Sequence, residues 1–163
     1  MAIANLPLSQ AIAKLNKEYS QLGNWIPEYL EKRQGYMILK PLKQRLYNQG
    51  VDGAGNKLPP YKSEKYKIFK RSKGVRAVPT TLFLEGNWYD SMYVKTGKKG
   101  KTHLIEVLTN RSAKNEPKKT KELKAKYGED ILTLNDDEAQ KIADELSIVL
   151  KEKFELNIDI ILK

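Results

Sequence analysis

The sequence predicts a small α+β domain: N-terminal helices, a small antiparallel sheet with a central hairpin and long basic loops, and a C-terminal helix and strand. Three observations predict it. Apolar residues recur at helical spacing near both ends of the chain, two strand-like runs flank a glycine-containing connector in the middle, and glycine, proline and lysine dominate the segments between them. The 163 residues are enough for one domain, residues 1–163, with a modest core.

The N-terminal region reads as two helices. Ser9 is placed to cap the first helix, and Gly23 supplies its stop. Asn24 is placed to cap a second helix that runs toward Asn48. Pro41 lies inside that second helix, where a proline removes a hydrogen bond and clashes with the preceding turn, so we expect a kink or two shorter helices.

A long loop is expected next, over residues 50–79. Its first part, "GVDGAGNKLPPY", is dense in Gly, Pro, Asp and Asn, all turn-forming residues. Its second part, "KSEKYKIFKRSKGVRAVP", is strongly basic and has room for a short helix. Loops of this length in small domains commonly bind a partner.

A β-hairpin is expected in the middle of the chain. Its strands are Trp88–Thr96 and His103–Thr109, and the glycine-containing segment Gly97–Lys101 connects them. Both strands are partly apolar on both faces, so the hairpin is expected to pack on a helix of this domain and on a neighbouring subunit.

The last part of the chain is expected to hold an extended loop, a helix and a strand. Residues 110–130 are polar and basic, which predicts the loop. Asn135 followed by Glu138 has the spacing of a capping box and predicts a helix start. "LNIDIIL" (156–162) alternates apolar and polar residues at its start, which predicts a strand.

The composition excludes several classes of protein. There is no cysteine, which excludes a disulfide scaffold, a thiolate metal site and a cysteine nucleophile. No apolar run approaches the ~18 residues of a membrane-spanning helix, so no membrane partner is expected. The start, "MAIANLPLSQ", has neither a basic end nor a long apolar stretch, so we expect no signal peptide.

The net charge of +10 is concentrated in the middle of the chain. Residues 57–126 hold 19 Lys/Arg and 6 Asp/Glu, while the rest of the chain holds 11 and 14. Such a region attracts nucleic acid or an acidic protein surface, and the alternative is a solvated face. Tyr61, Tyr66 and Phe69 are interleaved with these cations; they either stack on bases or anchor the segment to the core.

The sequence contains no recognisable catalytic or metal-binding pattern. His103 is the only histidine, and no nucleophile or orienting carboxylate stands at a recognisable spacing from it. "DGAGN" (52–56) lacks the spaced ligands of a calcium loop, and Asp136 and Asp137 are explained by helix capping. We therefore expect no enzyme, no catalytic residue, no metal and no cofactor.

Two segments together resemble a known family. "LYNQGVDGAGNKLPPYKSEKY" and "LFLEGNWYDSMYV" are similar to the tail-completion and head–tail connector proteins of tailed bacteriophages, also described as virion morphogenesis proteins. Leu82 or Leu84 with Gly86, Trp88, Ser91 and Met92 fall on the family's strand pattern, and "KYGEDILTLNDDEAQKIADEL" is similar to its late segment. The resemblance covers residues 47–146.

The resemblance implies a non-enzymatic virion protein of the neck or tail, assembled in the host cytoplasm into a ring through which DNA passes. Its implied partners are copies of itself, adjacent portal, connector or tail proteins, and non-specific genomic DNA. Leu84, Gly86, Trp88, Ser91 and Met92 are then expected to form a core or subunit-contact motif. The cations expected to face DNA or a partner are Lys62, Lys65, Lys70, Arg71, Lys98, Lys99 and Lys101. The alternative function is non-sequence-specific nucleic-acid binding, whereas a nuclease has no positive support.

Overall fold

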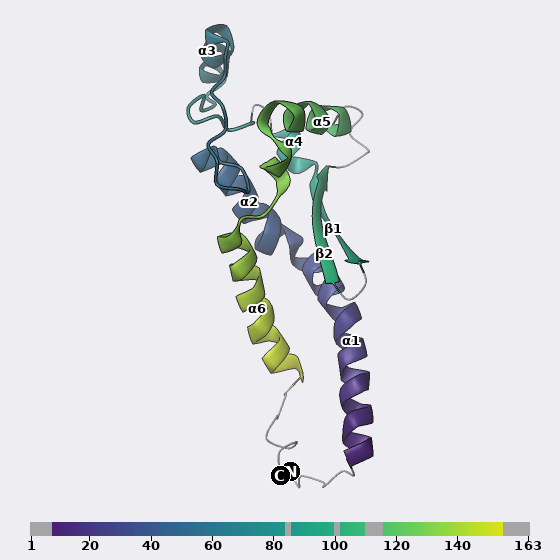
Figure 1. The fold of residues 1–163 in the computed structure, drawn as a ribbon. Helices are drawn as coiled ribbons and strands as arrows, with labels where there is room; N and C mark the ends of the chain where they lie inside the picture. Colours follow the sequence, from purple (N-terminus) through teal and green to yellow (C-terminus); the bar gives the residue numbers. More distant parts are fainter. Residues whose placement is uncertain (1–7, 84–85, 100–101, 110–115, 155–163) are drawn as a thin grey trace.

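The computed structural model describes residues 8–83, 86–99, 102–109 and 116–154. The fold is α+β, as predicted: helices surround a single two-stranded antiparallel sheet. The molecule is elongated, with helix α1 reaching one end and helix α3 lying at the other (Figure 1).

The predicted break at Gly23 is wrong. Helix α1 (Leu8–Gln34) runs through Gly23, Asn24 and Pro27 without interruption. Ile26 and Leu30 pack against the core beyond the glycine. A helix held in place by such packing adds one hydrogen bond per further residue, which offsets the roughly 1 kcal/mol that an internal glycine costs.

The expected disturbance at Pro41 takes the form of widened turns. The helical path continues from α1 through the π-helical turn η1 (Gly35–Leu39), helix α2 (Lys40–Gln44) and a second π-helical turn, η2 (Arg45–Gln49). The N–H of Lys40 donates to the carbonyl of Gly35, five residues back. Pro41 has no N–H to donate, and a widened turn just before it accommodates the missing bond without ending the helix.

The path ends at Gly50, whose φ of +63° and tight surroundings exclude a side chain. A Cβ there would lie 2.7 Å from Pro79 Cβ and 2.7 Å from the carbonyl oxygen of Thr80. The segment 50–83 is folded back at this point rather than left as an open arm. It contains helix α3 (Glu64–Ser72), the short helix allowed by the sequence, capped by Ser63 Oγ on the N–H of Tyr66.

The hairpin is present, but its first strand begins later than predicted. Strand β1 (Met92–Lys99) pairs antiparallel with β2 (Thr102–Thr109), with Val94 opposite Val107. Trp88 belongs instead to a helical turn, α4 (Asn87–Asp90), because Gly86 starts it at φ +88° and accepts from the N–H of Asp90. Gly97 lies within β1, so the predicted connector is also too long.

The predicted basic loop over 110–130 is largely helical. Helix α5 (Glu116–Tyr127) and the 3₁₀ turn η3 (Glu129–Leu132) occupy its described part. Leu123 and Tyr127, four residues apart, pack on the core and hold the helix there. The many polar residues of this segment predict a loop, and the two apolar residues four positions apart are too few to outweigh that pattern in the sequence.

Helix α6 (Asp136–Phe154) begins at the predicted capping box. The N–H of Glu138 donates to Asn135 Oδ1 at 2.8 Å, and the N–H of Asn135 donates to Glu138 Oε2 at 3.1 Å. The predicted strand 156–162 lies outside the described residues.

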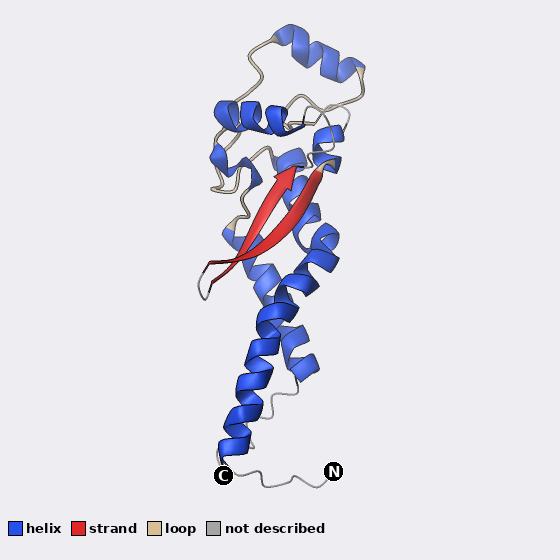
Figure 2. Ribbon diagram, turned by 90° about the vertical axis from the view of Figure 1, so that its right-hand side faces the viewer, coloured by secondary structure: helices blue, strands red, loops and turns tan. Residues whose placement is uncertain are grey.

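One core joins these elements. Ile38, Leu42 and Leu46 of the helical path are fully buried and meet Trp88 of α4, while Ile131 and Ile142 close the core from the C-terminal side. The hairpin crosses the helical path (Figure 2), so the buried face of β1 and β2 covers α1 and η1.

A buried ion pair ties the helical path to α6. Arg45 donates to Glu138 Oε1 at 2.9 Å, to the carbonyl of Thr133 at 2.6 Å and to the carbonyl of Val51 at 3.0 Å. Both charged side chains are buried, and Glu138 is the same residue that caps α6. One guanidinium thus joins the end of the helical path to Val51, six residues further on, and to the distant segment that holds Thr133 and Glu138.

We expect Glu138→Ala to lower the free energy of unfolding by about 3–5 kcal/mol, because it leaves Arg45 buried without its counter-charge. Urea denaturation followed by circular dichroism measures this. The matched control is Lys32→Ala, which removes an exposed ion pair to Glu28 of 2.7 Å and should change the free energy of unfolding by less than about 1 kcal/mol. Equal losses in the two variants would contradict the central role of the buried pair.

Candidate interaction surface

The most exposed apolar surface lies on and beside helix α3, at one end of the molecule (Figure 1). Of the seven large exposed hydrophobic residues in the described part of the chain, four lie there: Tyr66, Ile68, Phe69 and Val78. Ile68 is 61% exposed and Val78 is 67% exposed. We call these four residues, together with the exposed cations beside them (Lys62, Lys65, Arg71 and Lys73), the α3 tip.

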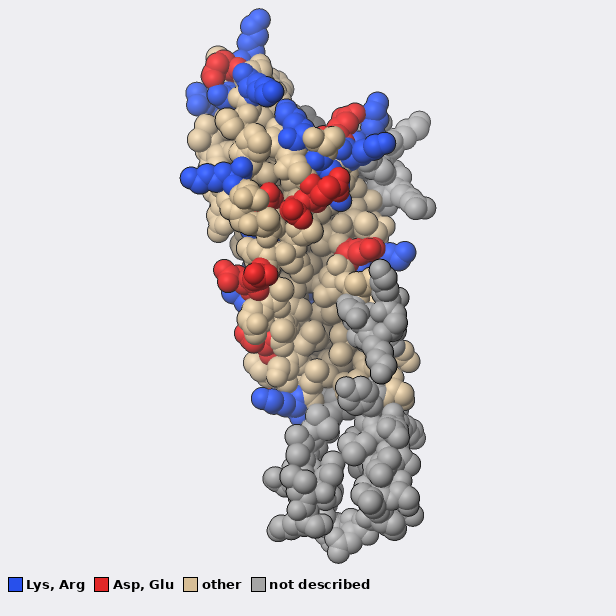
Figure 3. Space-filling model, viewed as in Figure 1, with Lys and Arg blue, Asp and Glu red and all other residues tan. Residues whose placement is uncertain are grey.

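The α3 tip is also cationic. Glu64 is the only carboxylate of helix α3, and it pairs with Lys67. In Figure 3, Lys and Arg side chains gather, with a few Asp and Glu, at the end of the molecule that carries α3 and α5, while the described face below is mostly tan with separate groups of Asp and Glu. The arrangement combines apolar contact area with positive charge, which suits a partner that is apolar and acidic at once.

Lys70 does not belong to this surface, and its predicted partner-facing role is wrong. Its side chain is fully buried, and its ammonium donates to Tyr61 Oη and to Thr81 Oγ1, both at 2.9 Å. The period of α3 is consistent with this: Ile68, two positions before Lys70, is exposed on the opposite face, while Lys70 points inward. No carboxylate of the described residues lies within ion-pair distance of Lys70.

A network of hydrogen bonds fixes α3 to the rest of the fold. Tyr61 Oη accepts from the N–H of Leu82 at 3.1 Å, and Tyr89 of α4 donates its hydroxyl to the carbonyl of Thr81. Burial raises the pKa of the Tyr89 hydroxyl well above its ordinary value, so this donor keeps its proton. These hydrogen bonds therefore hold the α3 tip in a fixed position on the rest of the fold.

The residues that carry the family resemblance build the scaffold under this surface. Trp88 is 1% exposed and donates its indole N–H to Thr120 Oγ1 at 2.8 Å, which joins α4 to α5. Met92 is buried, Gly86 starts α4, and Ser91 Oγ donates to the carbonyl of Trp88 at 2.8 Å. Leu84 lies outside the described residues.

The remaining predicted cations divide between the α3 tip and the hairpin end. Lys62, Lys65 and Arg71 are exposed on the α3 tip, as placed above. Lys98 and Lys99 belong to the last residues of β1, and Lys101 lies outside the described residues. The structure therefore brings only the first group together.

Sequence reasoning missed Ile68 and Val78. Both are aliphatic residues inside a basic, turn-rich segment, where the local pattern does not show whether an apolar side chain is buried or exposed. For Ile68, the available signal was its spacing of two from Lys70, which puts the two side chains on opposite faces of one helix.

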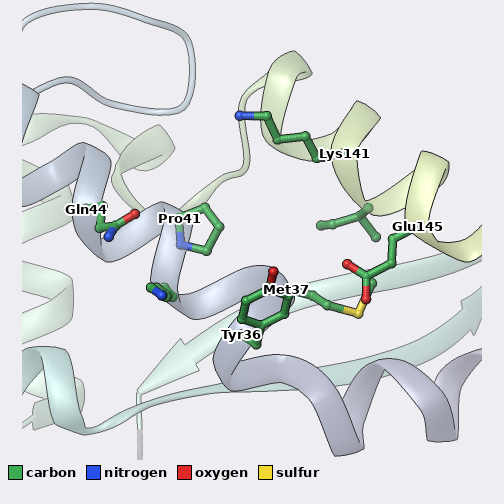
Figure 4. A pocket seen from close by; sticks show the side chains of 8 residues that line it. Tyr36, Met37, Pro41, Gln44, Lys141 and Glu145 are labelled. Carbon is green, nitrogen blue, oxygen red and sulfur yellow. The ribbon is translucent and has the colours of Figure 1, made fainter.

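A second, shallower feature is a hollow of about 260 Å³ where α6 crosses the helical path (Figure 4). Met37 and Ile142 contribute its apolar part, and Tyr36, Lys141 and Glu145 stand around it. Its lining residues include one carboxylate, that of Glu145, and no histidine. The described part of the chain contains no group of His, Cys, Asp and Glu side chains arranged to hold a metal ion.

Within the described residues, no helix has the length and apolar character needed to cross a bilayer. Comparison of the chain with protein-family models, with curated proteins and with solved structures finds no match.

We expect Lys70→Ala to destabilise the protein by about 2–4 kcal/mol, because it empties a filled site and removes a donor from two buried hydroxyls. Lys65→Ala, at an exposed position of the same helix, should change stability by less than about 0.5 kcal/mol. Chemical denaturation of both variants decides the matter. A stable Lys70→Ala protein with an unchanged midpoint would contradict the anchoring role of Lys70.

Proposed function

We propose that this chain is a non-enzymatic assembly subunit of a tailed-phage virion, a connector or tail-completion protein that forms a ring in the neck or tail. The observation that carries the assembly role is the α3 tip, where Ile68, Phe69 and Val78 are exposed together on a rigid base. The virion setting is supported by the resemblance of residues 47–146 to that family.

The apolar part of the α3 tip favours a protein partner. Large exposed aliphatic side chains, here Ile68 on α3 and Val78 in the segment that follows it, are costly in water and are typical of surfaces that another protein covers. Ile68 and Val78 have no π-face on which a base could stack, so they contribute nothing to a nucleic-acid platform.

The charge around these residues selects among protein partners. Lys62, Lys65, Arg71 and Lys73 surround the apolar residues and repel a second basic surface. The uncovered tip therefore favours an acidic surface, either on an adjacent virion protein or on a more acidic part of another copy. Residues outside 57–126 carry 14 acidic against 11 basic side chains, which makes such a contact between copies electrostatically favourable.

Non-sequence-specific nucleic-acid binding is the second candidate, and one observation favours it. Tyr66 and Phe69 are both partly exposed among the cations of the α3 tip, and an aromatic ring between cations can stack on a base while the cations bind phosphates. The two functions differ in which residues matter: aliphatic ones for protein contact, aromatic and cationic ones for nucleic acid.

We expect the purified chain to form concentration-dependent oligomers, seen by sedimentation velocity and as rings by negative-stain electron microscopy. Ile68→Ser/Val78→Ser should weaken this association, or the binding of co-expressed portal or tail proteins, by roughly 10- to 100-fold. The helical content measured by circular dichroism should not change, because both side chains are exposed.

The matched control is Lys62→Ser/Lys65→Ser, which leaves the aliphatic residues in place. If this variant loses DNA affinity while the aliphatic variant keeps it, and log affinity falls steeply with log salt, the nucleic-acid function holds instead. A chain that stays monomeric at all concentrations and binds no co-expressed virion protein would overturn the proposed function.

A further inference from the structure

The two edges of the sheet differ. The edge of β1 is covered by side chains of α1: the N–H of Val94 donates to Gln34 Oε1 at 2.6 Å, and the N–H of Thr96 donates to Glu31 Oε1 at 3.2 Å. These bonds also show that the N–H groups of Val94 and Thr96 point away from β2.

The register then determines which groups β2 presents on its other edge. Val94 lies opposite Val107, and Thr96 lies opposite Ile105. In an antiparallel ladder, both members of such a pair direct their N–H and C=O groups outward. Ile105 and Val107 therefore present backbone donors and acceptors along the outer edge of β2, and no hydrogen bond to another described residue satisfies them. A sheet edge of this kind can pair with a further strand.

A groove follows the outer edge of β2. Two adjoining hollows of about 470 Å³ and 330 Å³ share Val107, Leu108 and Leu132 among their lining residues. Ile105 and Val107 belong to the core-facing side of the sheet, whereas Glu106 and Leu108 belong to the other side. Because residues of both sides line the groove, it straddles the edge itself. Leu132 and Leu134 form an apolar wall beside it.

Residues 156–162 have the length and pattern of a strand that fits this edge. Seven residues extend about 23 Å, close to the span of the eight-residue β2. Leu156, Ile158, Ile160 and Leu162 fall on one side of an extended chain, where they would continue the apolar face of Ile105 and Val107. Asn157, Asp159 and Ile161 fall on the opposite side, and Lys121 and Lys124 among the lining residues of the groove offer cations to the carboxylate of Asp159.

Helix α6 carries the chain away from the groove. Leu134, just before α6, lines the groove, and α6 then runs away from it for 19 residues, about 28 Å (Figure 1). The end of α6 at Phe154 therefore lies far from the groove, at the opposite end of the helix.

We propose that the outer edge of β2 accepts residues 156–162 of a second copy of this chain as a third strand. The donor segment and the acceptor groove are different surfaces, so the contact is head-to-tail and builds a ring when the rotation between copies closes. The inference rests on the proposed function for the association of copies, and it names the strand that joins them.

The test uses two full-length variants that each lose one half of the contact. Ile158→Asp/Ile160→Asp disables the donor, and Ile105→Pro disables the acceptor. The proline removes an outward N–H that takes no part in pairing with β1, so the hairpin is kept. Each variant alone should associate about 100-fold more weakly than the natural chain in sedimentation velocity. An equimolar mixture should form a heterodimer, because one intact strand then meets one intact groove.

Asn157→Asp is the matched control for the donor variant, since it adds a carboxylate to the opposite side of the same segment and should associate as the natural chain does. A labelled peptide of residues 155–163 should also bind the donor variant, and the same peptide with Ile158→Asp and Ile160→Asp should not. The peptide experiment does not require the Ile105→Pro variant to fold.

The outcomes separate this inference from the proposed function. If the natural chain assembles and the donor variant assembles equally well, strand exchange is wrong while the assembly role stands. If the variants never form a heterodimer although the peptide binds the donor variant, the segment pairs within its own chain and the second-copy contact is overturned. If the natural chain is monomeric at all concentrations, both proposals fall.

Discussion

The ion pair between Arg45 and Glu138 is the interaction on which the rest of the fold depends. Its two residues are 93 positions apart, and the guanidinium also holds the carbonyls of Val51 and Thr133. Buried charges of this kind are stable only when their donors have partners, and here the partners are Val51, just beyond the helical path, and Thr133 and Glu138 at the start of α6. The pair therefore holds together the end of the helical path, the start of the 50–83 segment and the start of α6.

Around this junction the described residues form a buried, hydrogen-bonded scaffold, and two surfaces of the molecule are left uncovered. The scaffold buries Trp88, Met92 and Lys70, and its hydrogen bonds run from α3 through Thr81 to α4. The α3 tip and the outer edge of β2 lie outside it, with apolar side chains and backbone groups that nothing in the described chain covers. Uncovered surfaces on a hydrogen-bonded interior agree with the proposed assembly role, because a preformed surface lowers the entropy cost of association.

Local signals in the sequence predicted the elements whose causes are local. The capping box at Asn135 places the start of α6, and the turn residues around Gly50 end the helical path, because each acts through hydrogen bonds or φ angles within a few residues. The hairpin was also predicted, from alternation on both sides of a glycine-containing connector. Local signals failed where packing overrode them. Gly23 does not stop α1, Trp88 is drawn into α4 by Gly86 and its bond to Thr120, and α5 forms in a segment whose polar composition predicts a loop.

The sequence by itself determined the α+β class, the start of α6 and the concentration of positive charge in residues 57–126, and it allowed a short helix within the basic segment. Only the tertiary structure decided which cations face outward. Lys70 and Lys65 look alike in sequence, yet one is buried against two hydroxyls and the other is exposed, because the face of α3 that meets Tyr61 and Thr81 is chosen by packing. The same holds for the open edge of β2: a strand pattern shows that a strand forms, whereas its neighbours decide which edge is left without a partner.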